Sequence, residues 1–168
     1  MRNFQRPGER HTGMRITLAL VCVCACLAFP LPAQGQARAE KKVLLREDRV
    51  EKMLAFATKL LGVEYQFGAA SDRDDAVDCS SLVQKAFKDV GVTLPRTAYG
   101  QSRNGLEVEF SALRRGDRLY FKMTDRDVPI DHTALYLGDG NMLHAFPGKG
   151  VCVEPLDDYR TVLTSARR

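Results

Sequence analysis

The stretch VDCSSLVQKAF, residues 77–87, places a cysteine at the first turn of an amphipathic helix. Apolar side chains recur through it at helical spacing, at Leu82, Val83, Ala86, Phe87 and Val90. Asp78 or Ser80 is the expected N-cap, and Gly91 is the expected stop. The pattern therefore predicts that Cys79 lies at or beside a helix N-terminus.

The segments on either side of this helix indicate the fold class. Residues 46–61 form a second apolar stripe at helical spacing and end at Gly62, a typical helix stop. A Pro- and Gly-rich connection with one short helix near 97–103 follows the central helix. Short β-rich runs then occupy residues 118–122, 132–137, 141–146, 151–155 and 161–166. Helices followed by strands predict an α+β domain, with N-terminal helices packed on an antiparallel sheet of about five strands.

The N-terminus has the composition of a targeting segment. Four arginines precede the apolar run 16–31, and small residues follow it, so residues 1–37 are expected to be a signal peptide cleaved after Ala37. The run is shorter than a membrane-spanning helix, so we expect no spanning helix and an exported protein of the periplasm or cell envelope. Residues 38–45 would be a short linker and 46–168 the domain. A lipobox-like stretch leaves a lipid anchor at Cys26 as an alternative.

Charge and cysteine content narrow the function classes. Removing the four arginines and one glutamate of the signal lowers the formal net charge from +4 to +1, which gives no support for a nucleic-acid partner. Of five cysteines, only Cys79 and Cys152 follow the apolar run. In an oxidising compartment they could form a disulfide in an exported non-enzymatic domain, whereas catalysis requires a reduced Cys79. We expect a monomer.

A thiol nucleophile needs a base, and the chain offers few candidates. A helix N-terminus alone would lower a thiol pKa by less than about one unit, so an imidazole must assist. His132 and His144 lie in strand-like runs on either side of the turn signal LGDGN, residues 137–141. A two-residue turn alone would put them on opposite faces of the sheet. Catalysis therefore requires a three-residue loop or a bulge, with both imidazoles on the face toward Cys79 and in contact.

Metal sites are the competing interpretation of the same residues. Cys79, His132 and His144 are legitimate zinc ligands, but the paired local spacing of structural zinc motifs is absent. The aspartate-rich segments lack the glycine and glutamate of a calcium loop. We expect no metal and no cofactor.

The ordered motifs between Gly62 and Tyr159 resemble the NlpC-type family of bacterial cell-wall cysteine peptidases. The family's G-x-x-Y-x-x-G-G, D-C-S-G-L-V, L-P-R, G-D, H-V-G-I-Y-L-G and I-H-A patterns correspond to residues 62–69, 78–83, 94–96, 116–117, 132–138 and 143–145. Ala69 and Ser81 replace two of the family's glycines. Neither replacement removes a reacting group.

The resemblance implies a papain-like α+β fold and roles for six residues. Cys79 would be the nucleophile, His132 the general base and His144 the residue that orients it. The side chains implied at the oxyanion or substrate site are Tyr65, Asp78 and Ser80.

The resemblance also implies hydrolysis of peptidoglycan stem peptides through a thioester, at the D-glutamyl–diamino acid bond or at a cross-link. Amidase or acyltransferase chemistry occurs among relatives on this fold, and with a Cys79–Cys152 disulfide the same resemblance would imply a non-enzymatic wall-associated domain. Because the sequence shows no separate wall-targeting domain, a targeting partner or a lipid anchor would localise the protein.

Overall fold

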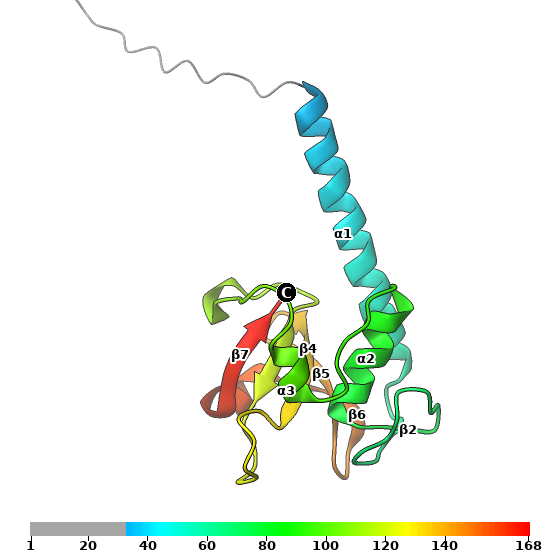
Figure 1. Ribbon diagram of the computed structural model, residues 1–168, viewed down its shortest axis with the longest axis vertical. Coiled ribbons are helices and arrows are strands. Elements are labelled where there is room, and N and C mark those ends of the chain that lie inside the picture. Colours follow the sequence, from blue (N-terminus) through cyan, green and yellow to red (C-terminus); the bar gives the residue numbers. More distant parts are fainter. Residues whose placement is uncertain (1–32) are drawn as a thin grey trace, which may run out of the picture.

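The computed structural model describes residues 33–168 (Figure 1). The helices are α1 (Ala33–Lys59), α2 (Cys79–Asp89) and α3 (Ala98–Ser102), with 3-10 turns at Phe110–Ala112 and Leu156–Val162. The strands are β1 (Glu64–Tyr65), β2 (Ala76–Val77), β3 (Arg118–Phe121), β4 (His132–Gly138), β5 (Asn141–Phe146), β6 (Gly150–Pro155) and β7 (Leu163–Arg167). The apolar run of the expected signal peptide and the lipidation alternative at Cys26 lie outside the described residues.

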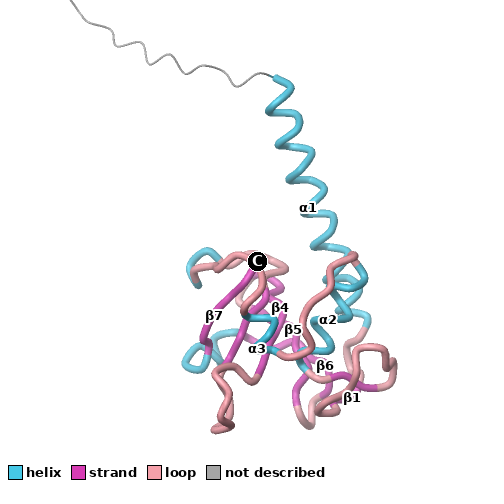
Figure 2. The backbone as a smooth tube through the Cα atoms, in the orientation of Figure 1, coloured by secondary structure: helices cyan, strands magenta, loops and turns pink. Residues whose placement is uncertain are grey.

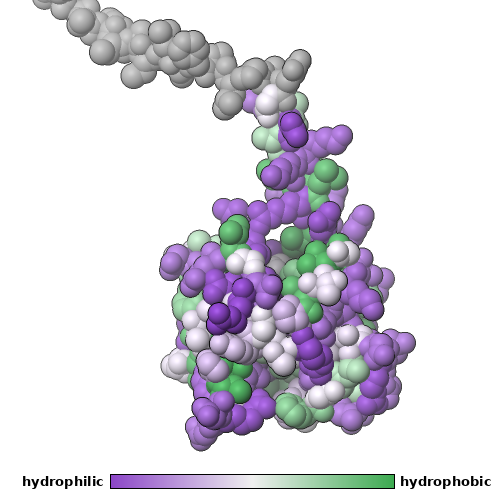
Figure 3. Space-filling view, in the orientation of Figure 1, coloured by the Kyte–Doolittle hydropathy of each residue, from purple (hydrophilic) through white to green (hydrophobic). Residues whose placement is uncertain are grey.

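Helix α1 is longer than the sequence pattern indicated. It begins at Ala33 rather than Arg46, so the residues expected as a linker, 38–45, are helical. They are good helix formers, and their side chains are exposed. In Figures 1 and 3 this half of α1 projects from the body as a mainly hydrophilic arm. None of the described helices combines the length and apolar composition needed to cross a bilayer.

The main sheet confirms the expected α+β architecture. Its five antiparallel strands run in the order β6-β5-β4-β3-β7. Strands β3 to β6 form the expected meander, and β7 returns past them to pair with β3. The short parallel pair β1–β2 lies just before α2 in the chain and is drawn in Figure 2 beside β6.

Each face of the sheet packs against its own apolar cluster. Leu135, Leu143 and Ala145 project from β4 and β5 into a core that includes residues of α1 and α2. The alternating residues Ala134 and Met142 project into a second core, built with Leu119, Phe121 and Leu156. A mostly buried sheet between two apolar layers holds the strand ends in fixed positions.

The β4–β5 hairpin meets the register requirement through a bulge. Leu135 pairs with Leu143 and Tyr136 with Met142, but Gly138 pairs with Asn141, so Leu137 is the extra residue. Asp139 and Gly140 form the turn with positive φ angles of 51° and 74°. His132 and His144 consequently share one face. That face carries Ala134 and Met142 of the second core, whereas α1 and α2 cover the other face. Cys79 lies beside the Thr133 N–H, at the end of β4 where His132 stands. The expectation that both imidazoles lie toward Cys79 stays a prediction.

A glycine at the start of β6 allows this strand to approach the end of α1. Gly150 has φ = +70°, and a Cβ added there would lie 2.5 Å from the carbonyl oxygen of Val63. The Val151 N–H donates to the same oxygen at 2.9 Å, and the Gly62 N–H donates to Val151 O at 2.9 Å. Only a residue without a side chain permits this pairing.

We therefore expect Gly150→Ala to lower the free energy of unfolding by about 3 kcal/mol, because left-handed strain and a backbone clash add together. Gly148→Ala is the matched control. Its φ is +76° with nothing within 4 Å of an added Cβ, so strain alone should cost about 1 kcal/mol. Urea unfolding of both variants measures the difference, and equal losses would show that the close approach to Val63 is unimportant.

Candidate active site

Cys79 is placed by a capping box at the start of α2. The Asp78 carboxylate accepts from the Ser81 N–H at 2.7 Å, and the Asp78 N–H donates to Ser81 Oγ at 2.8 Å. Both halves of this box use side chains, so Ser81 supplies a contact that a glycine could not make. Cys79 is therefore the first residue of α2, as predicted.

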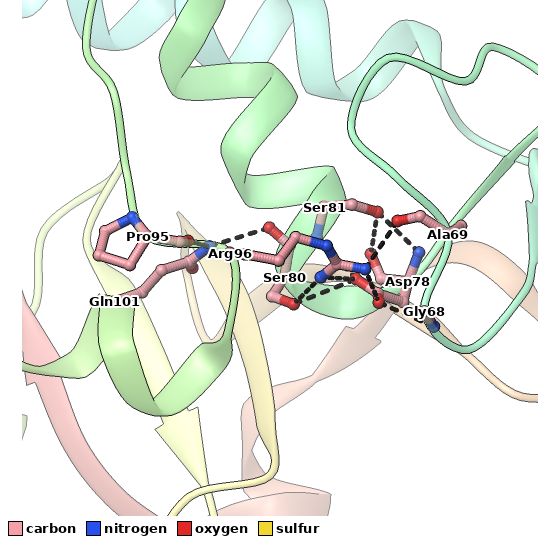
Figure 4. A network of polar contacts seen from close by, with 8 residues as sticks. All are labelled: Gly68, Ala69, Asp78, Ser80, Ser81, Pro95, Arg96 and Gln101. Atoms are coloured by element: carbon pink, nitrogen blue, oxygen red, sulfur yellow. Dashed lines mark hydrogen bonds and ion pairs between the residues drawn. The ribbon is translucent and has the colours of Figure 1, made fainter.

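Arg96 fixes the same carboxylate from the other side (Figure 4). Its guanidinium donates to both Asp78 oxygens, at 2.5 and 3.1 Å, to Ser80 Oγ at 2.8 Å and to Ala69 O at 2.7 Å. Burial alone would raise the pKa of Asp78, but hydrogen bonds from Arg96 and the Ser81 N–H outweigh it and lower the pKa. Asp78 is thus an ionised structural anchor beside the thiol.

The two histidines are in direct contact, as the register required. His132 Nε2 lies 2.9 Å from His144 Nδ1, and His144 Nε2 lies 2.9 Å from Glu154 Oε2. Glu154 also accepts from Lys149 and Tyr159. Burial would raise the pKa of Glu154, but these hydrogen bonds outweigh it and lower the pKa to about 2. Glu154 is therefore ionised and can only accept hydrogen bonds.

Both imidazoles are held neutral by their surroundings. Burial, with a smaller contribution from His144, lowers the pKa of His132 to about 3. Burial also lowers the pKa of His144, although Glu154 acts in the opposite direction. The rings pack among Phe121, Phe146 and Tyr159, which keeps the pair dry.

The acceptor at the end of this chain determines where each proton lies. Because Glu154 accepts, His144 carries its proton on Nε2 and presents an unprotonated Nδ1 to His132. His132 must then donate from Nε2, which leaves its Nδ1 without a proton. Within residues 33–168 that Nδ1 makes no hydrogen bond, so it is free to accept a proton.

The pKa of the Cys79 thiol is higher than its position at a helix N-terminus suggested. Cys79 is 7% exposed, and burial followed by the charge of Asp78 raises its pKa to about 11. The N–H groups of Thr133 and Ser80 act in the opposite direction but are weaker. The expected lowering by the helix N-terminus is therefore outweighed, and the resting thiol is protonated.

A cleft opens over the thiol. Its volume is about 590 Å³, and its lining brings together Cys79 with the three residues expected at a substrate or oxyanion site, Tyr65, Asp78 and Ser80. His132 and His144 are buried and do not line it. The rest of the lining is Phe67, Gly68, Arg96, Thr97, Ala98, Tyr99, Arg126, Val128, Ile130 and Asp131.

Two alternatives from the sequence are contradicted. Cys79 and Cys152 are both free, because Cys152 lies on β6 opposite His144 rather than beside the helix start. The proposed zinc ligands Cys79, His132 and His144 do not form a donor cluster in the described part of the chain. The group there that does is His144, Cys152 and Glu154, with donor atoms within 4.8 Å of one another. A cation there would have to displace the hydrogen bonds of Glu154.

Sequence reasoning missed Glu154 and Arg96 as parts of the site. Arg96 stands in the L-P-R motif, which was a signal for it. Glu154 follows Cys152 by two residues and so lies on the same face of β6. Its partner depends on the β5–β6 register, which the sequence did not specify.

A helix-start cysteine, a cleft above it and two hydrogen-bonded histidines on an antiparallel sheet define the papain-like class of cysteine peptidase folds. The chain belongs to the NlpC/P60 family, whose sequence profile matches residues 62–168.

Named relatives support this assignment. The chain is 36% identical over 85 residues to a gamma-D-glutamyl-L-lysine dipeptidyl-peptidase of Bacillus cereus, which covers 51% of this chain and 25% of that protein. It is 33% identical over 112 residues to the murein DD-endopeptidase MepS/murein LD-carboxypeptidase of Escherichia coli, covering 64% and 56%. The chain thus spans between a quarter and about half the length of these two relatives.

Solved structures agree. An NlpC/P60 family protein of Bacillus cereus superimposes with a TM-score of 0.65 at 30% identity, covering 71% of this chain and 39% of that one. The peptidoglycan hydrolase RipB of Mycobacterium tuberculosis gives a TM-score of 0.62 at 30% identity, covering 73% and 65%. The papain-like fold expected from the resemblance is confirmed.

The lowered histidine pKa values predict acid sensitivity of the fold. Below the unfolded pKa of 6.5 the unfolded chain binds protons at these histidines that the native chain refuses. Stability is therefore present above pH 6.5 and is lost as the pH falls toward the native pKa. We expect His132 alone to lower the free energy of unfolding by about 2 kcal/mol between pH 6.5 and 5, and His144 to add a loss of the same sign.

Urea unfolding at pH 7.5, 6.5 and 5 measures this loss. His132→Gln should remove the His132 part of it, about 2 kcal/mol, because only His144 then titrates differently in the two states. Equal stability at pH 7.5 and 5 would mean that both rings protonate freely in the native protein.

Proposed function

We propose that this chain is a cysteine endopeptidase that hydrolyses peptide bonds in peptidoglycan stem peptides. The observation that carries the proposal is the hydrogen-bonded series His132–His144–Glu154, which leaves a proton-accepting nitrogen on His132, in a site whose thiol opens to a cleft. The family assignment and the printed activities of the relatives support the substrate class.

In the proposed reaction the resting pair is a neutral thiol and a neutral imidazole. His132 Nδ1 takes the proton from Cys79 as the sulfur attacks the scissile carbonyl carbon. The same proton then passes to the leaving amine, and a thioester remains. Water, deprotonated by His132, attacks the thioester carbon, and the thiol leaves with the proton. No hydrogen bond joins Cys79 to His132 among the described residues, so their contact would tighten when substrate binds.

Developing negative charge on the carbonyl oxygen would be stabilised at the start of α2. The Cys79 N–H makes no hydrogen bond within residues 33–168 and belongs to the unpaired first turn of that helix. Tyr65 lines the cleft beside it. Burial raises the pKa of Tyr65, and the charge of Asp78 adds to this, so its hydroxyl stays protonated as a donor.

The finer assignments are part of the proposal. The bond cut is a D-glutamyl–diamino acid bond or a cross-link, and the enzyme acts in the cell envelope after export. The relatives named as a gamma-D-glutamyl dipeptidyl-peptidase and a murein DD-endopeptidase represent these two bond types.

Digestion of purified peptidoglycan, with identification of the released fragments by mass, tests the proposal and distinguishes the two bonds. Cys79→Ser should fold normally and lose at least about 10²-fold in rate, because a hydroxyl is poorly activated by the same base. Cys152→Ser is the matched control and should digest normally. Residual activity of Cys79→Ser within tenfold of the parent would sink the nucleophile assignment.

Glu154→Gln tests the direction of the proton chain. The amide keeps the size of the side chain but can donate to His144 Nε2, which would reverse both tautomers and protonate His132 on Nδ1. We expect a loss of about 10²-fold or more in kcat with little change in KM, because a wrong tautomer disables the base.

Lys149→Gln is the control, because it removes a partner of Glu154 but leaves the carboxylate. It should retain activity within about fivefold, since an exposed ion pair contributes little. The ¹⁵N chemical shifts of both rings report the tautomers directly. If Glu154→Gln keeps both the shifts and the rate of the parent, Glu154 does not direct the protons.

A further inference from the structure

Two arginines line the cleft, and they differ in how far their guanidinium groups are hydrogen-bonded to the protein. All the hydrogen bonds of Arg96 described above go to the protein, and its charge is paired with Asp78. Arg126 has no carboxylate partner within 4.0 Å among the described residues, and its only side-chain hydrogen bond runs from Nε to Thr124 Oγ1 at 3.2 Å. The four N–H donors of its Nη1 and Nη2 atoms are therefore unused by the protein.

Contacts from two loops hold this guanidinium over the cleft. Arg126 belongs to the loop 122–131 between β3 and β4, and its Cζ lies 5.2 Å from the ring centroid of Phe67, in the loop between β1 and β2. The Lys122 ammonium donates to the carbonyl oxygen of Arg126 and so braces the loop backbone. Arg126 and Phe67 both line the cleft that contains Cys79.

Within the part of the chain that the structure describes, no carboxylate near the cleft neutralises the positive charge of the Arg126 guanidinium by forming an ion pair with it. Asp131 accepts from the Met123 and Thr124 N–H groups at 2.8 Å each, and Lys122 lies 3.8 Å from it. Asp125 and Asp127 flank Arg126 in the sequence, but neither lines the cleft nor forms an ion pair with it. The field of Arg126 reaches the Tyr65 hydroxyl, whose pKa it acts to lower.

We propose that Arg126 binds a free carboxylate of the substrate beside the scissile bond, so that the enzyme prefers stem peptides that carry this acid to their amidated counterparts. The proposal rests on the proposed function and adds a specificity determinant to it. A guanidinium with two free nitrogens can hold a carboxylate through two parallel hydrogen bonds. The neighbouring apolar lining, Phe67, Val128 and Ile130, suits the aliphatic part of such a residue.

The chemistry of the substrate places a carboxylate within reach of either bond. A γ-linked glutamate keeps its α-carboxylate free a few bonds from the scissile carbonyl, on the acyl side. A diamino acid with two carboxyl groups keeps one of them free on the amine side. Arg126 can bind one of these carboxylates. Converting the acid to an amide removes the charge with little change of shape.

The test uses two pairs of synthetic stem peptides. In one pair the α-position of the γ-linked D-glutamate is either a carboxylate or a carboxamide, and in the other pair the free carboxylate of the diamino acid is varied in the same way. For the parent enzyme we expect kcat/KM to favour the acid by about tenfold in one pair, as a charge-assisted double hydrogen bond would give. Arg126→Gln should bring this ratio near one, mainly through KM, whereas Arg126→Lys should keep part of the preference.

Arg160→Gln is the matched control, because Arg160 is exposed, pairs with Asp157 and does not line the cleft. Its acid-to-amide ratio should equal that of the parent. The peptide pair whose acid-to-amide ratio changes in Arg126→Gln identifies which carboxylate Arg126 binds. Ratios that are the same in the parent and in Arg126→Gln for both pairs would overturn the proposal while leaving the peptidase activity established.

Binding to the Cys79→Ser protein, measured by calorimetry with the same peptides, separates the two proposals. If the parent cuts none of the peptides but Cys79→Ser binds the acids more tightly through Arg126, the proposed function fails and the carboxylate site stands. If binding does not distinguish acid from amide, the carboxylate site fails whatever the rate of cleavage.

Discussion

The ionised carboxylate of Asp78 is the interaction on which the arrangement of the site depends. It caps α2, receives two hydrogen bonds from Arg96, and accepts from the Gly68 N–H at 3.1 Å. Arg96 in turn reaches Ala69 O, so one ion pair, buried on the Asp78 side only, joins the helix start, the β1–β2 loop and the segment before α3. Removing Arg96 would leave the buried Asp78 carboxylate without its charged partner, which costs far more free energy than an exposed ion pair contributes. The position of Cys79 follows from this pair.

Local patterns predicted most of the fold. The helical spacing of apolar residues in 77–87 and the capping residue Asp78 predicted α2. Strand β5 has the predicted bounds, 141–146. The argument from side-chain alternation required a bulge or an odd loop between the histidines, and the bulge at Leu137 supplied it. These features are local or depend on a short turn, so a single sequence contains enough information to predict them.

The features that sequence missed depend on distant parts of the chain. The sign of the Cys79 pKa shift is set by burial in the folded protein, which no local sequence pattern reports. Glu154 meets His144 only because β6 pairs with β5 in one particular register. Helix α1 extends to Ala33 through residues whose apolar spacing is weak, because exposed helix formers need no buried stripe to continue a helix already held at its other end.

The raised pKa of the Cys79 thiol also affects its reaction with oxidants. With a pKa of about 11, roughly one Cys79 in 10⁴ is a thiolate at pH 7, against a few per cent for a free cysteine. Peroxides and disulfides react with the thiolate, so slow oxidation follows from the same burial that delays activation. A thiol that stays protonated in this way can therefore persist in reduced form under oxidising conditions, without a reductant to restore it.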